Sequence, residues 1–227
     1  MKINVDTTWS EIINAELEKD YFKKLLHFIN LEYDSNKIIY PEKDKIFRCF
    51  NFFNYNDLSV VILGQDPYYS KGMADGLAFS CSNGLTPKSL QNIFNEINRS
   101  LNVNRINPNL EDIAKQNVLL LNTCLTVEEN LPMSHSKIGW EIFVDNVIKF
   151  INVKCNNVIF LLMGNNAFKK EKLITNNSHI IFKTSHPSPL SYKKGFKDQD
   201  KKAFYCSNVF KDINETLLRL GKNKLNW

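Results

Sequence analysis

The fold class is indicated most clearly by one stretch, Leu58-Ser59-Val60-Val61-Ile62-Leu63-Gly64-Gln65-Asp66-Pro67-Tyr68. Its first six residues are mostly apolar and do not alternate with polar ones, which is typical of a strand buried on both faces of a parallel sheet. Polar residues follow directly, and Pro67 disfavours helical geometry for Asp66. The stretch therefore predicts a buried strand that ends in a polar turn. Taken alone, it indicates no more than a turn aspartate bonded to local backbone.

Three further apolar runs of this kind follow along the chain, at Val118–Leu121, Val158–Met163 and Ile180–Phe182. Between them lie stretches with helical character, around Ser89–Leu101, Trp140–Ile151 and Asn166–Ile174. Strands that alternate with helices predict an α/β fold with right-handed crossovers. We expect a central four-stranded, mainly parallel twisted sheet with helices on both faces.

Both ends of the chain are predicted to be helical. Apolar residues recur at roughly helical spacing from Trp9 to about Leu31, and Ser10 is expected to cap the start of that helix. A final helix around Ser207–Leu220 should end at Gly221, a C-cap residue. Because no repeat or long linker interrupts the chain, we expect one domain over residues 1–227, with an N-terminal helical portion, 1–56, packed on an α/β core, 57–227.

Composition narrows the class of protein without identifying it. The chain has 227 residues, 43% hydrophobic and 23% charged, which is ordinary for a globular protein with a sizeable core. A net charge of +5 is compatible with a polyanionic partner but does not establish one. The five scattered cysteines form no Cys-x-x-Cys pair, which argues against zinc, an iron–sulfur cluster or a disulfide framework. No signal peptide or long apolar run is present, so we expect a cytoplasmic protein.

The polar residues that follow the four apolar runs are the candidate site. In open parallel sheets, ligands bind outside the carboxyl ends of the strands. The segments at those positions are Gln65-Asp66-Pro67-Tyr68, Asn122-Thr123, Gly164-Asn165 and Ser185-His186-Pro187-Ser188. We expect them to surround one cleft, and this convergence is stronger evidence than any single segment.

Four segments, in this order, resemble the motifs of the uracil-DNA glycosylase family. They are Gly64-Gln65-Asp66-Pro67-Tyr68, Gly76-Leu77-Ala78-Phe79-Ser80, Leu119-Leu120-Leu121-Asn122 and His186-Pro187-Ser188-Pro189-Leu190-Ser191. The resemblance covers nearly the whole chain. It implies a cofactor-independent, metal-independent enzyme that flips uracil out of single- or double-stranded DNA and hydrolyses its N-glycosidic bond. It also implies a monomer in base excision repair, with a uracil-mimicking or DNA-mimicking protein inhibitor as a further expected partner.

The expected chemistry assigns two catalytic residues. Breaking a glycosidic bond develops positive charge on the sugar, which an ionised Asp66 would stabilise while it orients or activates the attacking water. The departing uracil carries negative charge, which an N–H of His186 would stabilise as an oxyanion hole does. The resemblance implies the same roles and a His186 that stays neutral.

Four more residues are expected to bind the base. The Asn122 amide offers an acceptor and a donor side by side, which match the N3–H and O4 of uracil and mismatch cytosine. The resemblance implies that Phe79 stacks on the base and that Tyr68 fills the space beside C5, where the methyl group of thymine would collide. Gln65 is carried over as a further substrate-binding residue.

The remaining candidates would bind DNA. Leu190 is expected on an exposed loop, where it would fill the gap left in the base stack, as apolar wedges do. The resemblance implies that Ser89, Gly164, Asn165, Ser188 and Ser191 hold phosphates, through contacts that carry no sequence information. Lysines at positions 193, 194, 197, 201 and 202 would add nonspecific attraction or form an ordinary solvated loop.

Two residues depart from the family pattern near the expected site. Tyr69 and Asp75 stand where the family frequently has histidines, so we transfer no proton-relay role to them. The alternative that stays open is a catalytically weak DNA-binding subunit of a replication or repair assembly. Altered base specificity is disfavoured by the pairing of Asn122 with Tyr68.

Overall fold

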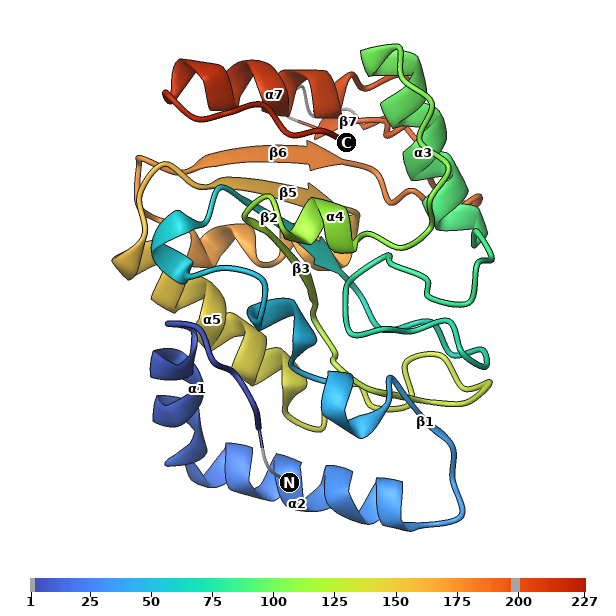
Figure 1. Ribbon diagram of the computed structural model, residues 1–227, viewed down its shortest axis with the longest axis vertical. Coiled ribbons are helices and arrows are strands. Elements are labelled where there is room, and N and C mark those ends of the chain that lie inside the picture. Colours follow the sequence, from blue (N-terminus) through green and yellow to red (C-terminus); the bar gives the residue numbers. More distant parts are fainter. Residues whose placement is uncertain (1–2, 197–200) are drawn as a thin grey trace.

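A computed structural model describes residues 3–196 and 201–227, and it confirms the predicted α/β fold. The central sheet has five strands in the order β3-β2-β5-β6-β7, and every neighbouring pair is parallel (Figure 1). The strands are β2 Val60–Gly64, β3 Val118–Asn122, β5 Ile159–Met163, β6 Ile180–Thr184 and β7 Lys201–Lys202. The prediction of four strands is therefore one short. β7 was missed because two lysines at a sheet edge form no apolar run.

β2, β3 and β5 are buried along their whole length, as runs without alternation predict. β6, whose outer neighbour β7 has only two residues, is mostly half-buried. Pairing of β2 with β3 sets Gly64 opposite Asn122, so both strands end at the same level. The residues that follow them consequently emerge side by side at one edge of the sheet.

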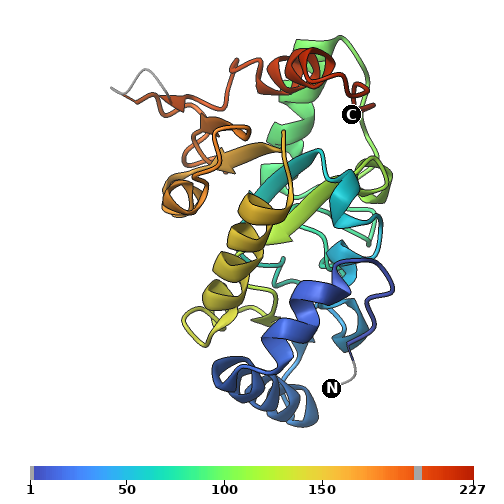
Figure 2. The same ribbon diagram turned by 90° about the vertical axis from the view of Figure 1, so that its left-hand side faces the viewer.

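Helices cover both faces of this sheet. Helix α5, Trp140–Lys154, lies on one face, and α3, Lys88–Leu101, packs with α7, Val209–Arg219, on the other (Figures 1 and 2). Gly221 has a φ of +71° just after α7, and the N–H of Lys222 reaches back to the Leu217 carbonyl. The predicted C-cap is confirmed, since glycine takes this left-handed conformation without steric cost.

Two predicted helices are wrong in detail. The stretch from Trp9 to Leu31 forms two helices, α1 Ser10–Leu17 and α2 Asp20–Asp34, because Lys19 adopts an extended conformation between them. Ser10 does not cap α1, since the preceding Trp9 is the N-cap residue and makes no side-chain capping hydrogen bond. The stretch from Asn166 to Ile174 is divided into α6, Asn165–Phe168, and a 3-10 turn, Glu171–Leu173.

Short elements complete the described chain. A small antiparallel pair joins β1, Ile39–Tyr40, to β4, Val127–Glu128. The others are the helix α4 Glu111–Ala114 and the 3-10 turns Lys43–Lys45, Arg48–Phe50 and Tyr55–Asp57. One continuous hydrophobic cluster extends from Trp9 to Trp227, which supports our proposal of a single domain over residues 1–227, with 1–56 packed on 57–227. Across residues 3–196 and 201–227, none of the helices has the length and apolar character needed to cross a membrane.

Candidate active site

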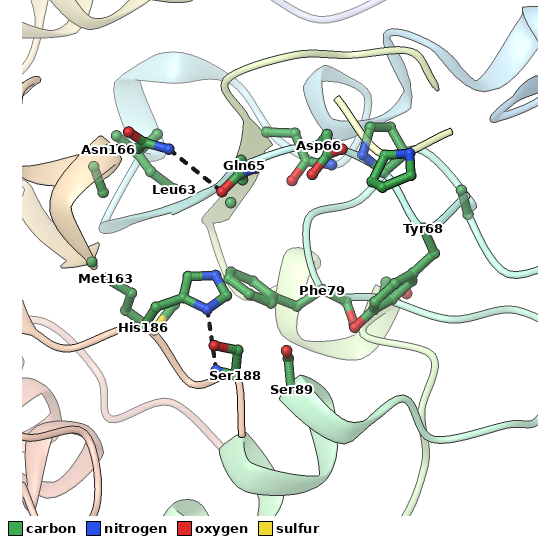
Figure 3. Close-up of a pocket in the computed structure, with 18 of the residues that line it drawn as sticks. Leu63, Gln65, Asp66, Tyr68, Phe79, Ser89, Met163, Asn166, His186 and Ser188 are labelled. Atoms are coloured by element: carbon green, nitrogen blue, oxygen red, sulfur yellow. Dashed lines mark hydrogen bonds between the residues drawn. The ribbon is translucent and has the colours of Figure 1, made fainter. Parts of the chain in front are cut away.

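A cavity of about 690 Å³ opens at the carboxyl ends of β2, β3, β5 and β6 (Figure 3). The twelve residues singled out from the sequence all line it, although they come from segments far apart in the chain. They are Gln65, Asp66, Tyr68, Phe79, Ser89, Asn122, Gly164, Asn165, His186, Ser188, Leu190 and Ser191. The expected convergence of the strand ends on one cleft is therefore what the structure shows.

Gly64 lets the carboxyl ends of β2 and β3 approach each other closely. A Cβ atom at this position would lie 2.1 Å from Oδ1 of Asn122 and 2.9 Å from Cβ of Ala78. Both distances are far inside van der Waals contact, so only glycine leaves room for the Asn122 amide beside β2. The glycine of the first motif thus shapes the position of the last residue of β3.

The Asn122 amide is buried but has free hydrogen-bonding capacity. The residue is 7% exposed at the end of β3. Within residues 3–196 and 201–227 its side chain makes no hydrogen bond. A buried amide without partners is costly unless something binds it. The arrangement can therefore recognise a ligand edge that offers one donor beside one acceptor.

Asp66 is half-buried, and its carboxylate is held by backbone. Oδ2 accepts a hydrogen bond of 2.8 Å from the N–H of Met133. Burial raises the pKa of Asp66 from its ordinary value, while this hydrogen bond and the residue's own N–H act in the opposite direction. A carboxylate largely withdrawn from water interacts strongly with positive charge that develops nearby. The sequence offered no signal for Met133, because only its backbone takes part.

His186 is a neutral hydrogen-bond donor. Its Nδ1 accepts the N–H of Ser188 at 3.1 Å, so the ring proton of the neutral form is assigned to Nε2. Burial lowers the pKa of His186, which favours this uncharged form at neutral pH. Gly164, at φ +86°, permits the close packing, because a Cβ there would lie 2.9 Å from Cβ of His186. The site can thus place an N–H beside developing negative charge.

Two aromatic side chains form walls of the cavity. In Figure 3 the Phe79 ring lies between His186 and Tyr68, and its centroid is 6.2 Å from that of the His186 ring. The Tyr68 hydroxyl donates to the carbonyl of Phe79 at 3.1 Å. Phe79 has a φ of +65°, a conformation that bulky residues rarely adopt without support from their surroundings. The two rings are consequently fixed relative to each other.

Asp75, one of the two departures from the family pattern, supports the turn that carries Phe79. It is 2% exposed, accepts the Leu77 N–H at 3.1 Å and the Ser80 hydroxyl at 2.7 Å, and lies 3.2 Å from Arg48 Nη1. Sequence reasoning missed this role, although a charged residue directly before a motif glycine was a usable signal. Tyr69, the other departure, lies exposed at the cavity rim.

The rim of the cavity carries Leu190 on a compact turn. Leu190 is 84% exposed, and the Ser188 carbonyl accepts N–H groups from Ser191 and Tyr192 at 2.9 Å. Asn92 of α3 donates to the Pro187 carbonyl at 2.8 Å and so ties this turn to the helix. An exposed leucine is therefore presented on a rigid support.

The other rim residues come from the first turns of α3 and α6 and from the lysine-containing loop that follows Leu190. Ser89 lies in the first turn of α3, Asn165 begins α6, and Asn166 donates to Gln65 Oε1 at 3.5 Å. The Lys193 ammonium lies over the rings of Tyr192 and Tyr205, 5.5 and 5.3 Å from their centroids. Lys197, another of the predicted basic residues, lies outside the described residues.

Comparisons with known proteins agree with this geometry. The model of the family described as "Uracil DNA glycosylase superfamily" matches residues 50–208. The uracil-DNA glycosylase of Borreliella burgdorferi (strain ZS7) is 46% identical over 230 residues, which span all of both chains. That of Aliarcobacter butzleri (strain RM4018) is 46% identical over 97% of this chain and its own full length. The crystal structure of mimivirus uracil-DNA glycosylase superposes with a TM-score of 0.89, at 25% identity, over 97% of this chain and 86% of that one. The chain described here therefore belongs to the uracil-DNA glycosylase superfamily.

Proposed function

We propose that this chain is a uracil-DNA glycosylase that works without metal or cofactor. It flips uracil out of DNA and hydrolyses the bond between the base and the sugar, leaving an abasic site and free uracil. The observation that carries the proposal is one cavity lined by both a half-buried carboxylate, Asp66, and a neutral His186 with Nε2–H as donor. Family membership and the named relatives support the reaction.

Asp66 acts on the sugar. As the bond from C1′ to N1 lengthens, positive charge spreads over the sugar ring, and the ionised carboxylate stabilises it. The oxygen of a water molecule, oriented or activated by the same carboxylate, then bonds to C1′ and loses one proton, which balances the proton that the released uracil anion takes up. The Met133 N–H keeps Asp66 in place and favours its charged form.

His186 acts on the leaving base. The departing uracil carries negative charge shared between its carbonyl oxygens and is protonated after release. A fixed N–H donor strengthens its hydrogen bond as that charge grows, and it needs no reorganisation at the moment of reaction. The Ser188 N–H on Nδ1 holds the ring in the tautomer that can donate from Nε2.

The lining of the cavity selects uracil. The Asn122 amide pairs with N3–H and O4 of uracil, whereas cytosine would leave buried polar groups unmatched at a cost of roughly 1–3 kcal/mol each. Phe79 stacks on the base, Gln65 contacts it from the end of β2, and Tyr68 occupies the space beside C5. The hydrogen bond from Tyr68 to the Phe79 carbonyl supports a rigid wall there, which would exclude the methyl group of thymine.

DNA is held at the rim in either single- or double-stranded form. Leu190 fills the gap that the flipped base leaves in a duplex, and its exposure supports this role. Ser89, Gly164, Asn165, Ser188 and Ser191 contact phosphates, while Lys193 and Lys194 add nonspecific attraction. We further propose a cytoplasmic monomer. A protein inhibitor that mimics uracil or DNA is a proposed partner, since a mimivirus relative was solved in complex with UGI.

A catalytically weak DNA-binding subunit is not favoured. Such a protein has no need of a buried carboxylate and a tautomer-fixed histidine in one cavity, and this chain has both.

The test is excision from duplexes that carry a single U, T or C at the same position, in the presence of a chelator, followed by cleavage at abasic sites. We expect strand cleavage with U only. Equal removal of T would refute the proposed role of Tyr68, and no removal of U would refute the proposed function.

A further inference from the structure

The loop after β4 contacts Asp66 from outside the four motifs quoted in the sequence analysis. The Met133 N–H supplies the one hydrogen bond that the Asp66 carboxylate accepts from another residue in the described part of the chain. Met133 has a φ of +62°, a left-handed conformation that a non-glycine residue keeps only when its surroundings impose it. The contact to Asp66 therefore depends on whatever holds this loop.

Several hydrogen bonds define the backbone of the loop. The N–H of Ser134 donates to the Leu131 carbonyl at 3.1 Å, and that of Ser136 donates to the Met133 carbonyl at 3.0 Å. The Ser134 hydroxyl accepts the N–H of Glu128 at 2.8 Å, which ties the loop to β4. These bonds shape the loop, while its start is tied to the segment after β2 by the N–H of Asn130, which donates to the Tyr69 carbonyl at 3.0 Å. The stretch from Met133 onward needs a further anchor.

His135 is the anchor to the interior. Its side chain is 2% exposed, and its Nδ1 lies 2.8 Å from Oγ1 of Thr126, which is fully buried. The indole N–H of Trp140, at the start of α5, also points at Thr126 Oγ1, at 2.8 Å. Because indole can only donate, Thr126 Oγ1 accepts from Trp140. The fully buried Thr126 hydroxyl has no other acceptor among the described residues, so we assign its hydrogen to Nδ1 of His135, which then accepts.

Because Nδ1 of His135 accepts the Thr126 hydroxyl hydrogen, the His135 ring is neutral and carries its proton on Nε2. Burial lowers the pKa of His135, in agreement with the uncharged form. The Cys124 thiol adds a contact of 3.1 Å to the His135 carbonyl, so side chain and backbone of the same residue are held. The backbone that begins two residues earlier, at Met133, is consequently set by buried groups in the segment between β3 and β4 and at the start of α5.

We propose that Trp140, Thr126 and His135 form a positioning chain that holds the Met133 N–H on the catalytic carboxylate. The three residues do not touch substrate; they act through Met133. The inference rests on the role proposed above for Asp66. The inference predicts that removing a hydrogen bond between these three residues slows the chemical step. DNA binding should stay intact, because Asp66 is displaced while the DNA-binding residues at the cavity rim are not.

The variant Thr126→Val tests this, since valine has nearly the same shape but cannot bond to Trp140 or His135. We expect the single-turnover rate of uracil excision to fall on the order of 10-fold, as for loss of one hydrogen bond to a charged group. KM and affinity for abasic-site DNA should not change. Thr126→Ser restores the hydroxyl and should recover the rate. Thr175→Val, which removes a hydroxyl bonded to Asn152 far from the cavity, is the matched control.

The decisive readout is the same substitution in an Asp66→Asn background. If Thr126 acts through Asp66, adding Thr126→Val to Asp66→Asn causes no further loss of rate. An equal fold-loss in both backgrounds, or no loss in either, overturns the inference and leaves the proposed function standing. Trp140→Phe, which removes the indole N–H that donates to Thr126, is the second variant should Thr126→Val not fold, and the same pattern is expected of it. If Asp66→Asn itself excises uracil at the native rate, the proposed role of Asp66 and this inference fail together.

Discussion

Gly64→Ala is the substitution whose effect follows most directly from the structure. The added methyl group would lie 2.1 Å from Asn122 Oδ1 and 2.9 Å from Cβ of Ala78, where ordinary contact begins at about 3.4 Å. The Asn122 amide must therefore move by roughly 1 Å or rotate out of the cavity. A displacement of this size at a positioning residue costs about 100-fold in rate. The contact with Ala78, which cannot bend away, adds a destabilisation of about 1–3 kcal/mol from overpacking.

The assay is single-turnover excision of uracil from a duplex, together with thermal unfolding and binding to DNA without uracil. We expect kcat/KM to fall about 100-fold, Tm to fall by several degrees, and binding to uracil-free DNA to persist. Gly195→Ala is the control, because nothing lies within 4 Å of a Cβ at that position. In an Asn122→Ala background the substitution should cost little further rate, since the amide is already gone. Native excision by a folded Gly64→Ala variant, or full additivity with Asn122→Ala, would show that Gly64 does not set the position of the Asn122 amide.

Three further predictions concern the base, the DNA and pH. Asn122→Asp should gain measurable removal of cytosine, because a carboxyl group can match the cytosine edge; a folded variant without such a gain would count against the role of Asn122. Leu190→Ala should slow excision from duplex DNA and leave excision from single strands nearly unchanged, since only a duplex has a gap to fill; an equal loss on both substrates would argue against a wedge. Burial raises the pKa of Asp66 from its ordinary value of 3.8, and protonation removes the charge that stabilises the sugar cation, so the rate should fall as the pH drops through a value above 3.8. An acid limb at or below pH 3.8 would contradict the buried environment of Asp66.

The sequence predicted those parts of the fold that depend on runs of apolar residues. β2, β3 and β5 are buried on both faces, and such strands are recognisable because they consist of apolar residues up to their last position, where β2 has Gly64 and β3 has Asn122. β7 has only two lysines, and its pairing with β6 is set by the path of the chain rather than by burial, so no local pattern indicates it. The break between α1 and α2 was invisible for a similar reason. Apolar spacing continues across Lys19, and only its extended backbone separates the two helices.

The sequence predicted more of the candidate site than of the fold, because the site residues lie in motifs that directly follow strands. What the sequence could not supply were partners that act through backbone or from a distance. Met133 contacts Asp66 through an N–H that every residue type except proline possesses. Asp75 was identified only as a departure from the family pattern, whereas it is a buried acceptor that pairs with Arg48 across 27 positions. Such contacts become visible only when the chain is folded.

Asp66 and His186 are proposed to excise uracil in the cavity at the strand ends. The most direct measurement compares the single-turnover rate of uracil release by the native chain with that of Asp66→Asn, alongside their affinities for abasic-site DNA. We predict that release falls by at least 100-fold, as for a charge that stabilises the transition state, while affinity for the abasic product stays within a few-fold. A variant that releases uracil at the native rate, or one that loses affinity as much as rate, would contradict the account.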